Sequence, residues 1–302
     1  MKALKYILLS FLGILVIFIL WGLIEPYFID KQEEVATIPN LPEAWEGQKV
    51  GVVGDFQVGM WLDNTNTVRR SIQELVEEKP AFALIIGDFV YHTLPDPETE
   101  IGTVTELLRP LVDAGIPTYA VLGNHDYSMS SPDGEAQERV AQQLEGELEA
   151  MGVSVLENEA ARVFLPGENT EPLYLVGIAA DWPGRDRPQV AFADVPDAAP
   201  RFVMMHNPNS FAEFAAQTAP IAVAGHTHGG QIRLPLTPQS SWLSFVKQDK
   251  VHADGWIDKG YGTEGNRLYV NRGIGFSLLP MRINCPPEIT MFTLRPNDTV
   301  GS

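Results

Sequence analysis

Five short segments of the chain carry side chains that bind metals, and each segment follows a run of apolar residues. The segments and their candidate ligands are GDFQVG with Asp55 and Gln57, IIGDF with Asp88, GNHD with Asn124, MMHNP with His206, and GHTHGGQ with His226 and His228. Carboxylate, amide and imidazole groups together are typical of a hydrolytic centre with two metal ions, not of a structural zinc site. The chain has one cysteine, Cys285, so a cage of thiolates is excluded.

The apolar runs predict β-strands. In the first half, strands at 49–54, 83–86 and 118–122 alternate with helices at 67–79, 103–113 and 136–151. This alternation favours a parallel sheet with crossover helices. The second half is mainly strands, at 153–156, 161–164, 173–178, 202–205, 221–224, 268–270 and 288–294, with one short helix at 210–216. Sites in open α/β sheets form at the carboxyl ends of the strands, so the five segments should meet at one rim.

The N-terminus predicts a membrane anchor. Residues 6–24 carry no charge and are long enough to span a bilayer as a helix. Lys2 and Lys5 precede this run and mainly acidic residues follow it, which favours a cytoplasmic N-terminus and an extracytoplasmic domain. No small-residue cleavage site follows, so we expect an uncleaved signal anchor over residues 1–29, with a cleaved signal peptide as the alternative. A polar stalk or extended lead-in at 30–47 and one domain at 48–297 complete the predicted organisation.

The chain is acidic. Its 21 Lys and Arg residues against 39 Asp and Glu residues give a formal net charge of −18. Such a surface repels the phosphate backbone of nucleic acids, so no nucleic-acid partner is expected.

The order of the five motifs resembles that of the calcineurin-like metallophosphoesterases, and the resemblance covers about residues 48 to 295. It implies a four-layered α/β/β/α sandwich with a binuclear metal site at the carboxyl rim of the sheets. It also implies hydrolysis of a phosphoester or pyrophosphate bond by an activated water. The cofactors would be two divalent ions, with Mn²⁺ favoured and Fe, Zn or Mg as alternatives.

The resemblance also implies a role for each motif residue. Asp88 would bridge the two ions, and His125 would face the phosphate and protonate the leaving oxygen or stabilise the transition state, oriented by Asp126. The remaining ligands would divide into one set of Asp55, Gln57 and His228 and a second set of Asn124, His206 and His226.

Gln57 departs from the family pattern, which has histidine at this position. An amide oxygen binds a hard cation such as Mn²⁺ or Mg²⁺, but suits Fe or Zn less well than imidazole does. Three outcomes stay open: a binuclear manganese site, a weakened first ion, or a domain that binds a phosphorylated ligand without turnover.

The anchor followed by IEPY and the C-terminal stretch from Val270 resemble one branch of the superfamily. It includes membrane-anchored UDP-diacylglucosamine pyrophosphatases of lipid A synthesis and related cell-envelope phosphodiesterases, which implies a phosphorylated small-molecule or lipid substrate. A lipid A enzyme would work on the cytoplasmic face, whereas the charge bias places this domain outside. An extracytoplasmic phosphoprotein phosphatase is a further alternative.

Several residues are weaker candidates for the substrate cleft. Asn271 and Arg272 would line the cleft or form a turn between strands, and His92 would reach the substrate or lie in a solvated loop. Arg233 is expected to be a charge on a strand face. The remaining candidates are Asp181 and Trp182 at the cleft, and Trp242, Phe245, Trp256 and Tyr261 as an apolar lip or as a small hydrophobic core under a loop.

Overall fold

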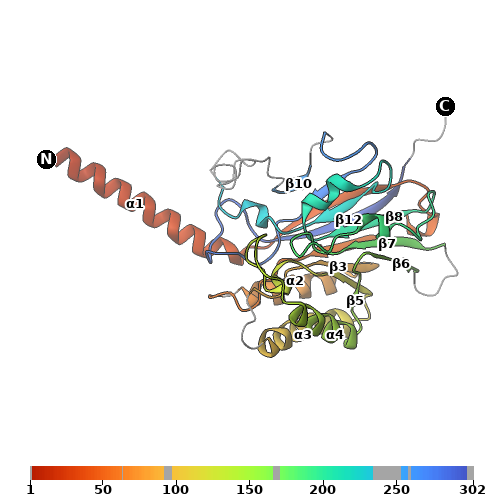
Figure 1. Ribbon diagram of the computed structural model, residues 1–302. Coiled ribbons are helices and arrows are strands. Elements are labelled where there is room, and N and C mark those ends of the chain that lie inside the picture. Colours follow the sequence, from red (N-terminus) through yellow and green to blue (C-terminus); the bar gives the residue numbers. More distant parts are fainter. Residues whose placement is uncertain are drawn as a thin grey trace.

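The computed structural model describes residues 2–62, 64–91, 97–165, 171–233, 253–257 and 260–297. Two six-stranded sheets lie face to face, and helices α2, α3 and α4 cover the outer face of the first sheet (Figure 1). The short helices α5 (Pro188–Ala191) and η4 (Pro208–Glu213) pack on the second sheet. This arrangement confirms the predicted α/β class and its layered sandwich.

The first sheet contains the alternating strands and helices that the sequence predicts. Its strands, in spatial order, are β1 (Asp30–Ile38), β12 (Glu288–Pro296), β2 (Lys49–Val53), β3 (Phe82–Ile86), β4 (Thr118–Val121) and β5 (Ser154–Val155). Strands β2 to β5 are parallel to one another. They are connected by α2 (Thr65–Glu78), α3 (Glu98–Asp113) and α4 (Glu138–Ala150).

The second sheet has a parallel centre and antiparallel edges. Its order is β10 (Gly255–Trp256), β11 (Leu268–Val270), β9 (Ala222–Ala224), β8 (Arg201–Met205), β7 (Leu173–Ile178) and β6 (Glu159–Val163). Strands β11, β9, β8 and β7 are parallel. The sequence did not predict β10 or α5, and the helix expected at 210–216 is the 3₁₀ helix η4.

Apolar side chains fill the spaces on both faces of the first sheet. Between the sheets, Phe202 and Phe292 pack edge to face with their ring centroids 5.6 Å apart. On the other face, α2 buries Val68, Ile72 and Leu75, which recur at the spacing of one helical face. The sheets are thereby fixed relative to each other, and the carboxyl ends of their parallel strands lie at one common rim.

The predicted stalk at 30–47 is wrong for its first half. Asp30–Ile38 is strand β1, which pairs in parallel with β12 along its whole length. Exposed positions alternate with partly buried ones over residues 30–35, most of which are charged, so the segment looks polar. Ala36 and Ile38, however, enter the core between the sheets. Trp45 is also fully buried there.

A buried ion-pair network fastens the start of β1 to the sheet. Arg272 pairs with Glu288 on β12 and donates from Nη2 to Asp30 Oδ2 at 2.7 Å. Glu288, which is 1% exposed, also accepts hydrogen bonds from the Tyr269 hydroxyl and from Thr290.

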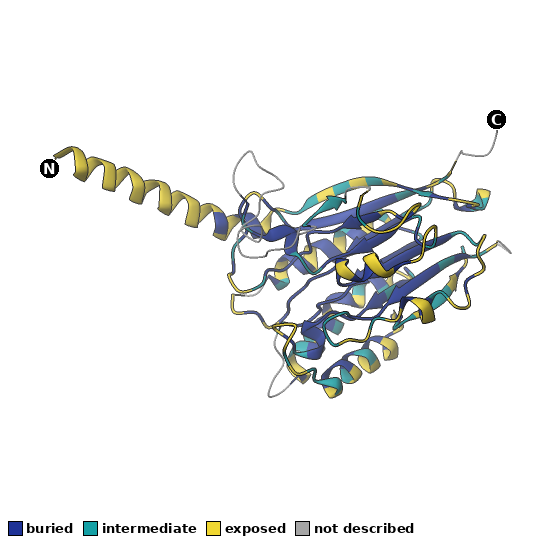
Figure 2. Cartoon of the chain, turned by 45° about the horizontal axis from the view of Figure 1, so that its top comes forward, coloured by how far each residue is buried: buried dark blue, intermediate teal, exposed yellow. Residues whose placement is uncertain are grey.

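Helix α1 (Lys2–Ile24) projects from one end of the body and exposes almost its entire length (Figure 2). It is long and apolar enough to cross a membrane, by length and composition. Its single buried residue is Gly22, in the last turn. The 3₁₀ helix η1 (Glu25–Tyr27) follows at once and leads directly into β1.

We expect Arg272→Met to destabilise the fold. Removing the guanidinium leaves the buried Glu288 carboxylate without its charge partner, which costs about 3–5 kcal/mol. For a domain of this size the melting temperature should fall by roughly 10 °C. The control Arg295→Met breaks an exposed pair with Glu46 and should change stability by less than about 1 kcal/mol. Equal melting temperatures of the two variants in detergent would contradict this assignment.

Candidate metal centre

The candidate ligands lie at the rim in loops that leave the strands abruptly. Asp55, Gln57, Asp88, His226 and His228 all have positive φ values, between 49° and 70°. Non-glycine residues adopt this left-handed conformation at a cost of about 1–2 kcal/mol each. Such strain at several neighbouring positions is typical of functional sites, where the surrounding structure holds the side chains in place.

Two glycines allow the loops to approach one another. A Cβ atom at Gly123 would lie 2.2 Å from Asp88 Oδ1, and one at Gly225 would lie 2.6 Å from Asp55 Oδ2. The glycines of GNHD and GHTH are therefore required by the close approach of carboxylates from a neighbouring strand end.

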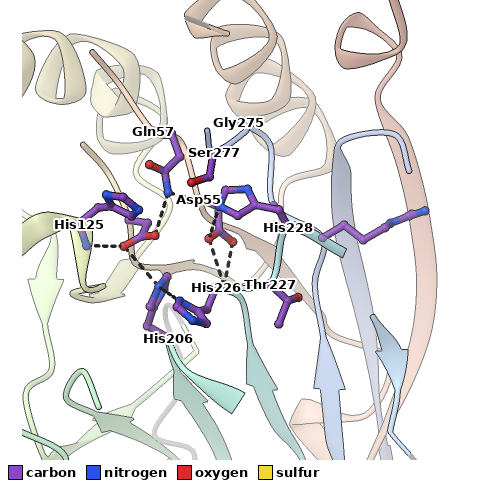
Figure 3. Close-up of polar contacts among 12 residues, drawn as sticks. Asp55, Gln57, His125, His206, His226, Thr227, His228, Gly275 and Ser277 are labelled. Carbon is purple, nitrogen blue, oxygen red and sulfur yellow. Dashed lines mark hydrogen bonds and ion pairs between the residues drawn. The ribbon is translucent and has the colours of Figure 1, made fainter. Parts of the chain in front are cut away.

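The first group of ligand atoms comes from Asp55, Asp88 and His228, which lie within 4.8 Å of one another and are all buried. His228 Nε2 is 3.6 Å from Asp55 Oδ1. Gln57 completes this group, because its Nε2 donates to Asp88 Oδ2 at 2.8 Å and lies 3.4 Å from His228 Nε2 (Figure 3).

The second group is formed by Asp88, His206 and His226. The Asn124 amide oxygen joins them, at 2.9 Å from His226 Nδ1 and 3.2 Å from His206 Nε2. His206 Nδ1 lies 2.8 Å from the main-chain oxygen of Ile86, so an Nδ1–H donated there leaves Nε2 free to ligate. The structure thus assembles all seven predicted ligands, and Asp88 is common to both groups.

The donor set fits a pair of hard divalent cations. Gln57 Oε1 and His228 Nδ1 are buried without a hydrogen-bond partner. Rotating the Gln57 amide by half a turn would exchange its two ends and place Oε1 toward the first group, where a cation would satisfy it. Carboxylate and amide oxygens with imidazole suit Mn²⁺ and related ions.

Electrostatics at the site also favour cations. Burial raises the pKa of Asp55 to about 7, and burial together with Asp88 raises that of Asp126 to about 8. Burial acts against a charged His206, but Asp88 outweighs it and raises the His206 pKa to about 9. Burial and then Arg282 lower the pKa of His228 to about 3. Without metal, the neighbouring Asp88 therefore favours the protonated form of His206.

His125 lies beside the two groups, but Asp126 does not orient its ring as predicted. His125 Nδ1 is 2.9 Å from the main-chain oxygen of Tyr91, and the two rings stack at 4.9 Å. The Asp126 carboxylate accepts the N–H groups of Asp88, Val90 and Gly123. Asp126 therefore joins the loops after β3 and β4, a main-chain role that the residue pattern did not reveal.

Arg282 supports the loops of the site, a role that its residue pattern did not indicate. It is fully buried, and among the described residues its guanidinium donates to the Cys285 sulfur and to main-chain oxygens. The carbonyl acceptors are those of His228, Arg272, Gly273, Gly275 and Cys285. It thereby holds the GHTH loop against the loop that follows β11.

The two substrate-binding predictions for this loop are not supported by its geometry. Asn271 is fully buried and donates to Glu288 and Thr290, and Arg272 is engaged in the ion pairs at β1. Arg233 is not a surface charge either, because it is buried and pairs with Asp254 at 2.9 Å. These side chains stabilise the loops around the metal centre from the side facing away from it.

The structure places the aromatic candidates for the substrate cleft in three different ways. Trp182 packs edge-on against His226 at 4.8 Å and bounds the site. Trp256 packs edge to face against the core residue Tyr269, and Tyr261 stacks on Phe211, so the small-core alternative holds for these two. His92, Trp242 and Phe245 lie outside the described residues.

The chain belongs to the calcineurin-like phosphoesterase family, whose model matches residues 48–230. Phosphodiesterase YaeI of Escherichia coli K12 is 33% identical over 221 residues, 72% of each chain. The uncharacterised metallophosphoesterase YkuE of Bacillus subtilis is 28% identical over 90% of this chain and 87% of its own. A transmembrane protein with a metallophosphoesterase domain from Danio rerio is 25% identical over 85% of this chain and 55% of its own. The protein is accordingly a hydrolase that acts on phosphoester bonds.

We expect Gln57→His to tighten Zn²⁺ binding about tenfold, or ~1.4 kcal/mol, because imidazole suits zinc better than an amide oxygen does. Gln57→Leu, of similar size but without a ligand atom, should weaken binding of one ion. Titration calorimetry with Zn²⁺ and Mn²⁺ on the metal-free full chain measures both effects. Identical affinities of wild type, Gln57→His and Gln57→Leu would show that position 57 does not contact the ion.

The metal-free protein should lose stability as pH rises from about 6.5 to 9. The pKa of His206 is raised from 6.5 to about 9, so its stabilising charge is fully present below pH 6.5 and is lost through pH 9. The raised pKa values of Asp55 and Asp126 act in the same direction. Bound cations favour the deprotonated ligands, so Mn²⁺ should abolish the decline. Melting temperatures in EDTA that stay constant across this range would contradict the expectation.

Proposed function

We propose that this protein is a membrane-anchored, metal-dependent phosphodiesterase that uses two divalent ions, preferably Mn²⁺. The observation that carries the proposal is the position of Asp88, which is shared by two groups of ligand atoms at the rim. Asp55, Gln57 and His228 would hold one ion, and Asn124, His206 and His226 the other. When bound, such a pair of ions neutralises phosphoryl oxygens and supplies a water nucleophile at neutral pH.

His125 is the group we assign to proton transfer. Tyr91 fixes Nδ1 through its carbonyl oxygen and supports the ring by stacking, which leaves Nε2 for the substrate. The His125 main-chain N–H donates to Asp88 Oδ1 at 2.9 Å, so the ring position is tied to the carboxylate between the two groups. In this role His125 protonates the leaving oxygen as the bond to phosphorus breaks.

The relatives and the candidate anchor support one class of substrate. The Escherichia coli relative is named a phosphodiesterase, which favours a diester over a monoester. A chain anchored in a membrane meets lipid-linked phosphates at high local concentration, which favours a phosphorylated lipid or a nucleotide-sugar lipid. The charges flanking α1 favour a cytoplasmic N-terminus and an extracytoplasmic domain.

The rival function is a domain that binds a phosphorylated ligand without turnover, because Gln57 weakens the first ion. It predicts at most one tightly bound ion per chain and no effect of Asp88→Asn on any rate. The complete set of Asp55, Asp88, Asn124 and the three histidines at 206, 226 and 228 favours catalysis, since a binding site needs no second cation.

His125→Ala should lower kcat for bis-p-nitrophenyl phosphate about 10²- to 10⁴-fold, the usual contribution of a general acid. Metal content should stay unchanged, because His125 belongs to neither group of ligand atoms. Asp88→Asn should instead lose both ions together with activity. The assay is release of p-nitrophenol by the full chain in detergent with Mn²⁺, with metals counted by elemental analysis. A folded wild-type chain that is inactive with every divalent ion would overturn the proposal.

A further inference from the structure

We propose that the end of the domain around the metal centre is embedded in the bilayer interface. The contact surface is an apolar rim of six exposed residues: Tyr27, Phe28, Trp61, Leu62, Leu278 and Leu279. Its partner is the lipid surface of the membrane that α1 enters. The proposal rests on the connection of α1 to the domain and on the composition of the surface beside it.

The last turn of helix α1 packs directly on the domain. Its 23 residues span about 35 Å, little more than the thickness of the hydrocarbon core. Gly22 lies within this apolar span yet already packs on the domain, where a Cβ atom would meet Ile283 at 3.1 Å and Met281 at 3.2 Å. The Gly22 main-chain oxygen accepts the Arg282 N–H at 2.9 Å. The domain surface must therefore lie at the level where the helix leaves the lipid.

The turn after α1 is fixed to two separate loops. Glu25 is 3% exposed, and its carboxylate accepts the main-chain N–H groups of Asn284 and Cys285. The Pro26 carbonyl accepts hydrogen bonds from Asn64 Nδ2 at 3.0 Å and from Thr67 Oγ1 at 3.1 Å. These contacts hold both the loop after β2 and the loop before β12 beside the end of the anchor.

Exposed apolar residues gather on these two loops and on the turn after α1. Outside α1, the described part of the chain exposes nine large hydrophobic residues, and six of them form the apolar rim. Trp61, Leu62 and Leu278 are 58%, 67% and 62% exposed. The other three are Val35, Phe164 and Val190. An apolar cluster continuous with a membrane helix is typical of a bilayer contact, and Trp and Tyr are the residues preferred at the interface.

Two cationic side chains lie beside the turn that follows α1. Arg70 donates from Nη1 to the Tyr27 main-chain oxygen at 2.9 Å, and Arg69 is exposed next to it on α2. Arginines beside a membrane-spanning segment place their guanidinium groups among lipid phosphates. They supply local positive charge on a chain that is otherwise strongly acidic.

The apolar rim is also connected to the metal centre. The Met60 N–H donates to the Gln57 carbonyl at 3.2 Å, one residue before Trp61. On the other side, Gln231 Nε2 donates to the Leu279 carbonyl at 2.9 Å, and the Gln231 N–H donates to the His228 carbonyl at 2.9 Å. If the proposed hydrolysis holds, the site therefore opens beside the headgroups, and a substrate would be cleaved while its tail remains in the lipid.

Spin-label accessibility tests the contact without any catalysis. Leu279→Cys and the control Phe164→Cys replace residues that are both 49% exposed. Phe164 follows β6 at the end of the sheet away from the rim, because Val163 pairs with Leu173 at the start of β7. The full chain carrying either label is reconstituted into phosphatidylcholine–phosphatidylglycerol vesicles. The wild-type chain, whose Cys285 is buried, gives the background signal.

The label at 279 is expected to collide more with oxygen, which partitions into lipid, than with a water-soluble nickel chelate, and the label at 164 should show the reverse. Leu62→Cys repeats the test on the other loop if the first variant does not fold. Equal nickel accessibility at 279 and 164 would overturn the proposal. Protection of position 279 from both reagents would also overturn it, because that result indicates a protein partner. Neither outcome depends on whether the chain hydrolyses phosphodiesters.

Discussion

Three fully buried carboxylates, those of Asp55, Asp88 and Asp126, lie at one rim of the sandwich. The surrounding structure must offset the repulsion among them. Burying charge is costly unless the charge is paired or satisfied by hydrogen bonds. Asp126 is satisfied by main-chain N–H groups, and Asp88 by Gln57, His206 and the His125 N–H. Asp55 receives the His226 N–H. Divalent cations would complete this compensation, which accounts for the concentration of ligand groups in so few loops.

The loops that hold these carboxylates are supported by groups that never face the ligand site. Arg282 binds five main-chain carbonyls beneath the GHTH loop, and Asp126 binds three main-chain N–H groups behind the GNHD loop. Each uses a single buried charge to satisfy several backbone dipoles at once. The positive φ values of the ligands are maintained by this support, because an unsupported loop would relax toward ordinary backbone geometry.

Helix α1, the candidate membrane span, and the candidate metal centre are held by the same structural elements. The loop from Ser277 to Cys285 contacts α1 through Arg282 and Ile283, and contacts the metal-site loop through Gln231. The loop after β2 carries Gln57 at one end and Asn64, bonded to Pro26, at the other. Helix α1 is therefore part of the architecture around the site rather than a segment attached to an independent domain. This coupling favours catalysis at the membrane surface.

The sequence alone determined the family, the parallel strands of the first half and the seven candidate ligands, because each ligand follows a short apolar run at a strand end. It failed where a residue's role depends on distant partners. Arg272 was a candidate for the substrate cleft but is occupied by Glu288 and Asp30. Residues 30–38 looked like a stalk because β12, their partner, lies about 250 residues later. Asp126 was assigned to the neighbouring imidazole, whereas it bonds to the loops. Only the tertiary structure decided these points, since buried polar groups are satisfied by whatever the fold brings near them.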